Sequence, residues 1–210
     1  MKRQFKTIVS IVMILLTTAV LAQDGSVRTV FKKGVTNSGG YGALTNKFTT
    51  IRGKFTNMSG IYGGWFINHR FMVGAGASAM TNNLRVPVQY RADPLRDLSY
   101  EYGQVGLVTE YVIGSDKPIH LAFSLFSGAG FTLQYERYGW HSGNDPEDIR
   151  DENWFFVAEP GVQLEVNLFK WMRLSPGISY RKSFGSDGLG LKDKDISNIS
   201  YNATLKFGKF

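Results

Sequence analysis

Histidine is the side-chain type that gains or loses a proton near neutral pH, and the sequence contains three: His69, His120 and His141. His141 is followed directly by Ser142, an arrangement that would offer a base and a nucleophile for hydrolysis. Such chemistry requires the two side chains to converge with a third group within hydrogen-bond reach, which neighbours in a loop rarely achieve. His69 and His120 lie far in sequence from partners for a triad. We therefore predict structural roles for these two, no catalytic residues, and a protein that is not an enzyme.

Carboxylates are dense in the segment 136–153, where Ca²⁺ or Mg²⁺ could be held between them and phosphate groups. They are Glu136, Asp145, Glu147, Asp148, Asp151 and Glu152. Their spacing matches no EF-hand loop, so a solvated acidic loop is the favoured interpretation. The sequence also has no phosphate-binding Walker loop, no zinc-binding HExxH pattern and no complete dinucleotide-binding glycine pattern. We predict no metal site and no cofactor.

Charge and cysteine content exclude further classes of protein. The formal net charge is +7, and it falls by three, to +4, when the basic residues Lys2, Arg3 and Lys6 are left out. The remaining basic residues do not gather with aromatic residues on one face, so a nucleic-acid partner is not indicated. The absence of cysteine excludes disulfides, thiol chemistry and lipid attachment through an N-terminal cysteine.

The first 22 residues have the pattern of a cleaved export signal. A basic start precedes an apolar run from Ile8 to Leu21, and the residues up to Ala22 suit cleavage before Gln23. The apolar run has about fourteen residues, whereas a helix needs about twenty to span a bilayer. No second hydrophobic stretch of helical length follows, so we expect any membrane insertion to use strands.

An apolar face with a period of two residues runs through the segment 154–181, with a break at 169–171. Its first arm has even-numbered apolar residues such as Val162 and Leu164 and odd-numbered polar residues such as Glu159 and Glu165. Two such strands, each more than ten residues long and joined by a tight turn, fit a hairpin with lipid outside and a polar lumen inside.

The same alternation, read along the whole chain, predicts an all-β fold: an eight-stranded antiparallel up-and-down transmembrane β-barrel. The expected strands are 41–51, 58–67, 70–80, 100–113, 119–135, 154–168, 172–184 and 199–207. The connections are tight at 68–69, 114–118 and 169–171; the others are the short link 52–57 and the long loops 81–99, 136–153 and 185–198. Short turns at one end and long loops at the other are typical of outer-membrane barrels. A soluble lipocalin-like barrel is the alternative, but its water-facing wall would expose too large an apolar surface. We assign 1–22 to the signal peptide, 23–40 to a periplasmic lead-in and 41–210 to the barrel.

Several segments resemble a family of small outer-membrane β-barrel proteins of Gram-negative bacteria, and the plan is similar to barrels of the OmpA, OmpX and OmpW types. They include GGYGAL (39–44), FINHRFMVGAGA (66–77), EPGVQLEVNLFKWMRLSPGISYR (159–181) and TLKFGKF (204–210). The resemblance implies the outer membrane as location, with its lipid, lipopolysaccharide and the barrel-assembly machinery as partners. It also implies an assembly signal in a final aromatic residue, which is Phe210 here. Phe210 has the wrong parity for the lipid face, so either Gly208 marks a bulge, or Phe207 closes the apolar face and Phe210 lies past the sheet.

Parity also places charged residues in the lumen. Inward residues are odd-numbered on both arms of the central hairpin, so opposing residue numbers must have an even sum, which excludes a two-residue turn. With the turn centred on Lys170, the numbers of two opposing residues add up to 340. This places Glu159 opposite Arg181 and makes Arg173 a diagonal neighbour of Glu165. Eight strands leave an interior that side chains fill, where charges must be paired. The predicted lumen network consists of Glu110, Glu159, Glu165, Arg173, Arg181 and Lys206.

Three functions are compatible with this sequence. The first is a structural or surface-interaction protein with a plugged polar lumen and an unidentified surface ligand. The alternative is a narrow channel for small solutes, and the third is an enzyme that modifies lipid A, for which His141 would be the candidate base. The acidic segment 136–153 adds the separate hypothesis of divalent cations held at lipopolysaccharide phosphates.

Overall fold

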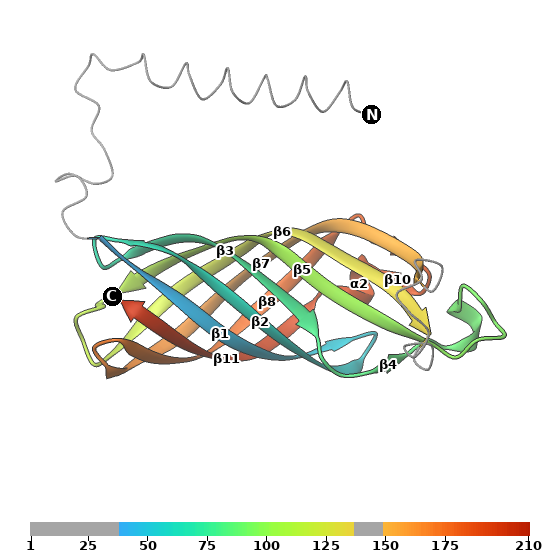
Figure 1. The fold of residues 1–210 in the computed structure, drawn as a ribbon, viewed down its shortest axis with the longest axis horizontal. Helices are drawn as coiled ribbons and strands as arrows, with labels where there is room; N and C mark the ends of the chain where they lie inside the picture. The colour runs from blue at the N-terminus through green and yellow to red at the C-terminus, as the bar shows by residue number, and fades with distance from the viewer. Residues whose placement is uncertain (1–37, 137–148) are drawn as a thin grey trace, which may run out of the picture. The chain divides into compact units, whose positions relative to one another are not determined.

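The computed structural model describes residues 38–136 and 149–210 (Figure 1). The predicted signal peptide, nearly all of the predicted lead-in, His141 and most of the acidic segment lie outside these residues. Among the described helices, none is long and apolar enough to cross a membrane.

Eight long strands form one antiparallel ring (Figure 1). They are β1 (Ser38–Ile51), β2 (Lys54–Ile67), β3 (Phe71–Met80), β5 (Leu98–Ile113), β6 (Ile119–Glu136), β7 (Ile149–Phe169), β8 (Met172–Phe184) and β11 (Asn198–Lys209). Sequential strands pair with each other, β1 pairs with β11, and a ladder between β3 and β5 completes the circle. The predicted fold class is confirmed.

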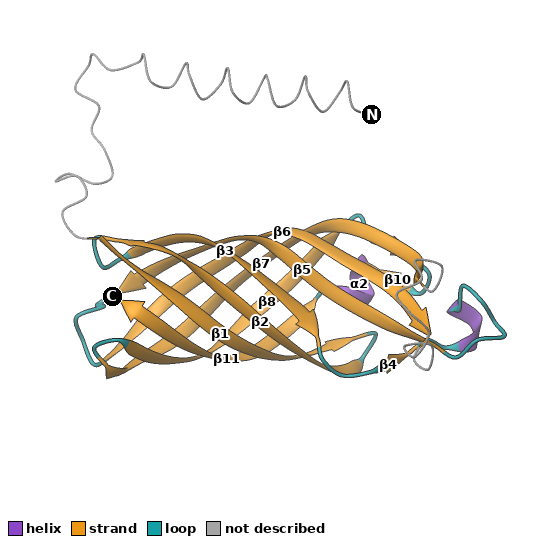
Figure 2. Cartoon of the chain, in the orientation of Figure 1, coloured by secondary structure: helices purple, strands orange, loops and turns teal. Residues whose placement is uncertain are grey.

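The two ends of the barrel differ (Figure 2). Among the described residues, the connections at the end that holds the C-terminus are the tight turns between β2 and β3, β5 and β6, and β7 and β8; we call it the turn end. The opposite, loop end has short elements within its connections: β4 (Leu84–Arg85), η1 (Val88–Tyr90), β9 (Asp187–Gly188), β10 (Leu191–Lys192) and α2 (Asp193–Ile196). This asymmetry is the one that the sequence predicted.

Several predicted strand ends need correction. The expected link 52–57 is a two-residue turn, because Arg52 and Gly53 both have positive φ and β2 already begins at Lys54. The expected loop 81–99 is shorter at its far end, because Leu98 and Ser99 belong to β5 and pair with β6 and β4. Alternation does not mark Leu98 and Ser99, because both faces of β5 are buried at this end of the strand.

The register of the central hairpin agrees with the predicted sum of 340, as the pairs Gly161 with Ser179 and Asn167 with Arg173 show. The turn itself, however, has two residues, with Phe169 paired to Met172. A β-bulge between Asn167 and Phe169 takes up the extra residue. The exclusion of a two-residue turn was therefore wrong, because parity along a strand is conserved only where no bulge interrupts the ladder.

The outer surface of the ring is an apolar belt. Large hydrophobic side chains from every long strand are exposed there, including Leu44, Ile61, Val73, Leu107, Phe123, Leu164, Ile178 and Leu205. Aromatic rings border the belt, with Trp65, Tyr111, Phe169 and Trp171 near the turn end and Phe48, Phe55, Trp154 and Phe184 near the loop end. A contiguous belt of this kind, flanked by aromatic girdles, is suited to hydrocarbon rather than water.

Candidate functional site in the barrel lumen

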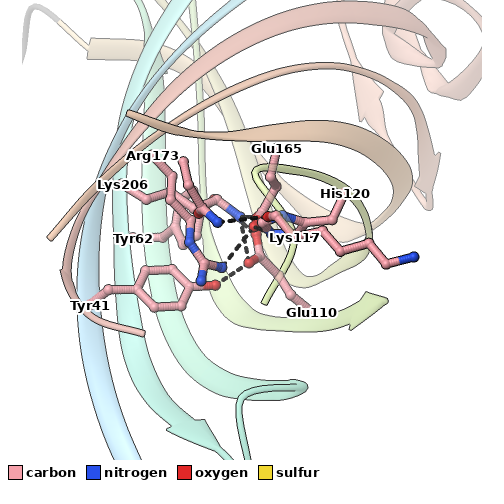
Figure 3. Close-up of polar contacts among 9 residues, drawn as sticks. Tyr41, Tyr62, Glu110, Lys117, His120, Glu165, Arg173 and Lys206 are labelled. Atoms are coloured by element: carbon pink, nitrogen blue, oxygen red, sulfur yellow. Dashed lines mark hydrogen bonds and ion pairs between the residues drawn. The ribbon is translucent and has the colours of Figure 1, made fainter. Parts of the chain in front are cut away.

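The lumen near the turn end contains a group of interacting polar side chains that we call the turn-end cluster: Tyr41, Tyr62, Glu110, His120, Glu165, Arg173 and Lys206 (Figure 3). They come from seven different strands. In each of these strands, one of the residues that face inward is polar and lies at this level along the barrel axis. The side chains of Glu110, Glu165 and Lys206 have no exposed surface.

Lys206 joins the two carboxylates of this cluster. Its Nζ donates to Glu110 Oε2 over 2.7 Å and to Glu165 Oε1. Glu110 also accepts hydrogen bonds from the Tyr41 hydroxyl and, over 2.8 Å, from the Tyr62 hydroxyl. A buried carboxylate is costly unless its lone pairs are occupied, and these donors provide that compensation.

Glu165 has two further partners. Arg173 Nη1 donates to its Oε2 over 3.0 Å, and His120 Nε2 lies 2.8 Å from the same oxygen. His120 Nδ1 lies 3.0 Å from the carbonyl oxygen of Lys117 in the β5–β6 turn. The carbonyl oxygen of Lys117 can only accept, so that contact is a hydrogen bond when Nδ1 carries a proton. The contact with Glu165 is a hydrogen bond when a second proton lies between Nε2 and the carboxyl oxygen. His120 thus connects the cluster to a turn.

Glu159 forms a second polar layer, closer to the loop end. It accepts hydrogen bonds from Lys47 Nζ at 2.7 Å, Gln104 Nε2 at 3.0 Å and Ser179 Oγ at 2.6 Å. Among the ion pairs of the described residues, its partner is therefore Lys47 and not Arg181. The predicted Glu159–Arg181 salt bridge is wrong, although the register places the two opposite each other.

Arg181 instead points toward the loop end, and it is fully buried. Its Nε donates to the Ile196 carbonyl oxygen over 3.0 Å, its Nη1 lies 3.0 Å from Met58 Sδ, and its guanidinium carbon lies 4.8 Å from the centre of the Tyr102 ring. A planar guanidinium suits this combination of a carbonyl and an aromatic face. Arg181 thereby ties the helix α2 to the inside of the barrel.

Apolar residues close the lumen beyond Arg181. We call this group the apolar seal: Met58, Tyr102, Phe155, Leu191 and Ile196, all buried within one hydrophobic cluster. Two of them belong to the segment β10–α2, which is also fixed by a 2.8 Å hydrogen bond from the Arg52 amide to the Asp195 carbonyl oxygen. The connection between β8 and β11 therefore folds over the mouth of the barrel.

The predicted alternatives for the last residues can now be distinguished. The β1–β11 ladder is regular through Gly208, and Phe207 stacks on Trp171 with ring centres 6.2 Å apart. Phe210 follows the end of β11, where its ring lies 5.1 Å from that of Tyr41 and under the Arg173 guanidinium at 3.9 Å. Phe210 therefore lies past the sheet, as the second of the two predicted alternatives states.

The structure thus places all six predicted lumen residues inside the barrel and brings four of them, Glu110, Glu165, Arg173 and Lys206, into direct contact. Sequence reasoning missed Lys47, His120, Tyr41 and Tyr62 as members of the network. Inward parity was the available signal for His120. In the described part of the acidic segment, Glu136 pairs with Arg96, and the described residues contain no group of three or more His, Asp or Glu side chains that could hold a metal ion.

A closed eight-stranded ring with an apolar belt and a filled polar lumen defines a small transmembrane β-barrel of the outer-membrane type. Comparison with solved structures agrees. Neisserial surface protein A is similar to this chain with a TM-score of 0.55 and 12% identity, over 82% of this chain and 97% of that one. Ail, the attachment invasion locus protein of Yersinia pestis, has a TM-score of 0.45 at 12% identity, over 82% and 97% of the two chains. OprG from Pseudomonas aeruginosa has a TM-score of 0.42 at 12% identity, over 81% and 95%.

The likeness to Neisserial surface protein A supports the fold, and at 12% identity it supports nothing finer. No model of a known protein family matches the chain, and no curated protein matches it in sequence. The predicted resemblance to small outer-membrane barrels is confirmed at the level of fold, and the predicted outer-membrane location agrees with it and with the apolar belt. Any specific role must be argued from the lumen and the loops.

Proposed function

We propose that the protein is an integral outer-membrane barrel with a plugged lumen, which acts as a scaffold for surface-exposed loops rather than as a channel. The observation that carries this proposal is that three groups of side chains fill the lumen one after another along the barrel axis: the turn-end cluster, the Glu159 layer and the apolar seal. A hydrated ion would have to break paired buried charges at one end and cross a hydrophobic constriction at the other. The narrow channel is therefore the weaker alternative.

The loop end supports a role in surface interaction. Leu95 is 96% exposed and Val88 is 62% exposed, both in the connection between β4 and β5. Salt bridges within this connection, such as that from Arg91 Nη2 to Asp97 Oδ1 at 2.6 Å, stabilise its conformation. Apolar side chains on a braced loop are suited to contact a partner. Outer-membrane lipid, lipopolysaccharide and the barrel-assembly machinery are the remaining proposed partners.

Planar-bilayer recording on the purified protein tests the plug. We expect no large, steady conductance from the wild type, and such conductance would refute the proposal. Surface orientation is tested separately by protease treatment of intact cells. We expect cleavage within 81–97 or 185–197 and none within 114–118; cleavage confined to 114–118 would mean the inverse topology.

The lipid A-modifying alternative depends on His141, which lies outside the described residues. Lipid A can be compared by mass spectrometry between cells with and without the protein. We expect identical spectra. A mass difference that disappears on His141→Ala would replace the scaffold with an enzyme.

A further inference from the structure

A carboxamide side chain lies within the apolar belt on the outside of the barrel. Asn46 of β1 faces outward, because Leu44 and Phe48 on the same face of the strand are 56% and 40% exposed. Leu44 belongs to the belt and Phe48 to the aromatic border near the loop end, so Asn46 lies at the depth of the hydrocarbon. Polar groups at this depth have no water to bond with, and in membrane proteins they face other protein groups.

The Asn46 side chain lacks the hydrogen-bond partner that this environment calls for. Its Oδ1 atom is buried and has no partner among the described residues. Asn57, an outward asparagine of the neighbouring strand β2, differs in this respect, since its Oδ1 accepts a hydrogen bond from the Thr81 hydroxyl over 2.7 Å. A buried polar atom without a partner is costly where water cannot reach it. Asn46 is therefore a group that a second molecule could satisfy.

Asn46 lines a groove of about 820 Å³, which we call the belt groove. The residues paired with Asn46 on either side are small: Ala203 of β11 and Ser59 of β2. Ala79 of β3, which pairs with Ser59, continues this row, and the strands lie side by side in the wall (Figure 1). Larger side chains also line the groove, namely Leu44, Ile61, Val105, Phe131, Leu174 and Leu205. Small residues around a polar group allow a second protein wall to approach closely within a membrane.

The depth of Asn46 and the chemistry of its carboxamide select the occupant of the groove. Phospholipid acyl chains are apolar and cannot complete its hydrogen bonds. A second copy of this chain, inserted in the same direction, has its own Asn46 at the same depth. A carboxamide carries both a donor and an acceptor, so two copies related by a twofold axis along the membrane normal satisfy each other through the same group. Rotation about χ2, which is soft in asparagine, turns Oδ1 outward for this contact.

We propose that the belt groove is the interface of a homodimer in the outer membrane, with the two Asn46 carboxamides paired at its centre. The small residues Ser59, Ala79 and Ala203 let the two walls come within hydrogen-bond reach. Both loop ends then face the same side of the membrane next to each other, so the dimer presents twice the loop surface of one barrel. This inference goes beyond the scaffold role, which concerns a single barrel.

Sedimentation equilibrium of the purified protein in density-matched detergent micelles tests the proposal. We expect the wild type to show a concentration-dependent equilibrium between monomer and dimer. Asn46→Leu removes the amide pair and leaves an apolar outer surface, so the dimer should dissociate about tenfold more readily. Asn46→Gln keeps the carboxamide and should retain most of the association. Ala79→Leu fills the belt groove and should abolish the dimer.

Ala158→Leu is the matched control, because Ala158 lies on the same outward face of β7 as the exposed Phe156 but does not line the belt groove. It should leave the dimer intact, and heat-modifiable gel migration confirms that each variant is folded. A wild type that stays monomeric at every concentration would overturn the proposal. An association that neither Asn46→Leu nor Ala79→Leu weakens would do the same.

Native mass spectrometry of the same samples distinguishes a second copy from a lipid. We expect a dimer in the wild type. A monomer that carries a lipid, which is lost in Asn46→Leu, would assign the belt groove to that lipid and refute the dimer. Neither measurement depends on conductance or on what the loops bind, so the plugged scaffold and the dimer can fail separately.

Discussion

Replacing Lys206 by methionine tests whether charge pairing stabilises the lumen. The substitution keeps the volume of the side chain but leaves the carboxylates of Glu110 and Glu165 without their shared cation. Removing one partner of a buried ion pair costs about 3–5 kcal/mol. Here each carboxylate keeps other donors, namely two tyrosines on Glu110 and Arg173 with His120 on Glu165. We therefore expect the low end, about 3 kcal/mol, or roughly a hundredfold change in the folding equilibrium.

Urea unfolding in lipid vesicles, followed by tryptophan fluorescence, measures this loss. Lys192→Met is the control, because its ion pair with Asp187 is exposed to solvent and contributes little. Adding Glu110→Gln to Lys206→Met removes one uncompensated charge, so the double variant should regain part of the stability. If Lys206→Met unfolds at the same urea concentration as Lys192→Met, the lumen is not stabilised by charge pairing and the argument for the plug loses its basis.

Three further predictions concern the ends of the barrel. Gly190→Ala should destabilise the protein more than Gly53→Ala in urea, since both glycines have positive φ but only at Gly190 would a Cβ meet another atom, a tyrosine hydroxyl, at 2.6 Å; equal losses would contradict this. A hydrogen bond from its lysine partner, helped by the charge of that lysine, lowers the pKa of Asp187. The support that this carboxylate gives to the β9–β10 hairpin is therefore present above its unfolded pKa and lost as the pH falls through the lowered folded value, so the protection of the hairpin amides from hydrogen exchange, corrected for the intrinsic pH dependence of exchange, should fall only in acid. Phe210→Ala should reduce the amount of assembled, heat-modifiable barrel in cells more than Phe207→Ala, and the reverse order would exclude Phe210 as the assembly signal.

Alternation of polar and apolar residues was sufficient to predict the ring and the inward face of its strands, because lipid on one side and a crowded lumen on the other impose opposite preferences on neighbouring residues. Glu165 and Arg173 were predicted as diagonal neighbours, and they are in contact. That inference succeeded because the two strands are adjacent and the predicted register of the pair was right, although the turn that joins them was not.

Contacts across the lumen could not be predicted in the same way. Lys47 on β1 reaches Glu159 on β7, and these strands are not neighbours in the ring. Which residues lie at the same level along the barrel axis depends on the stagger of all eight strands, and the sequence does not show this stagger directly. Arg181 is a further case: its partner is the carbonyl oxygen of Ile196, in a short helix that no alternation pattern marks.

The composition of the turn-end cluster has a consequence for how the barrel forms. Each of seven strands contributes one member, in the order Tyr41 from β1, Tyr62 from β2, Glu110 from β5, His120 from β6, Glu165 from β7, Arg173 from β8 and Lys206 from β11. Lys206 bonds Glu110, and their strands β11 and β5 are not adjacent in the ring. An open sheet cannot make this contact, so before the β1–β11 and β3–β5 ladders close, these charges must remain in contact with water or lipid headgroups. Closure of the ring and pairing of the buried charges are therefore coupled, and the cluster favours the complete eight-stranded barrel over any partly closed form.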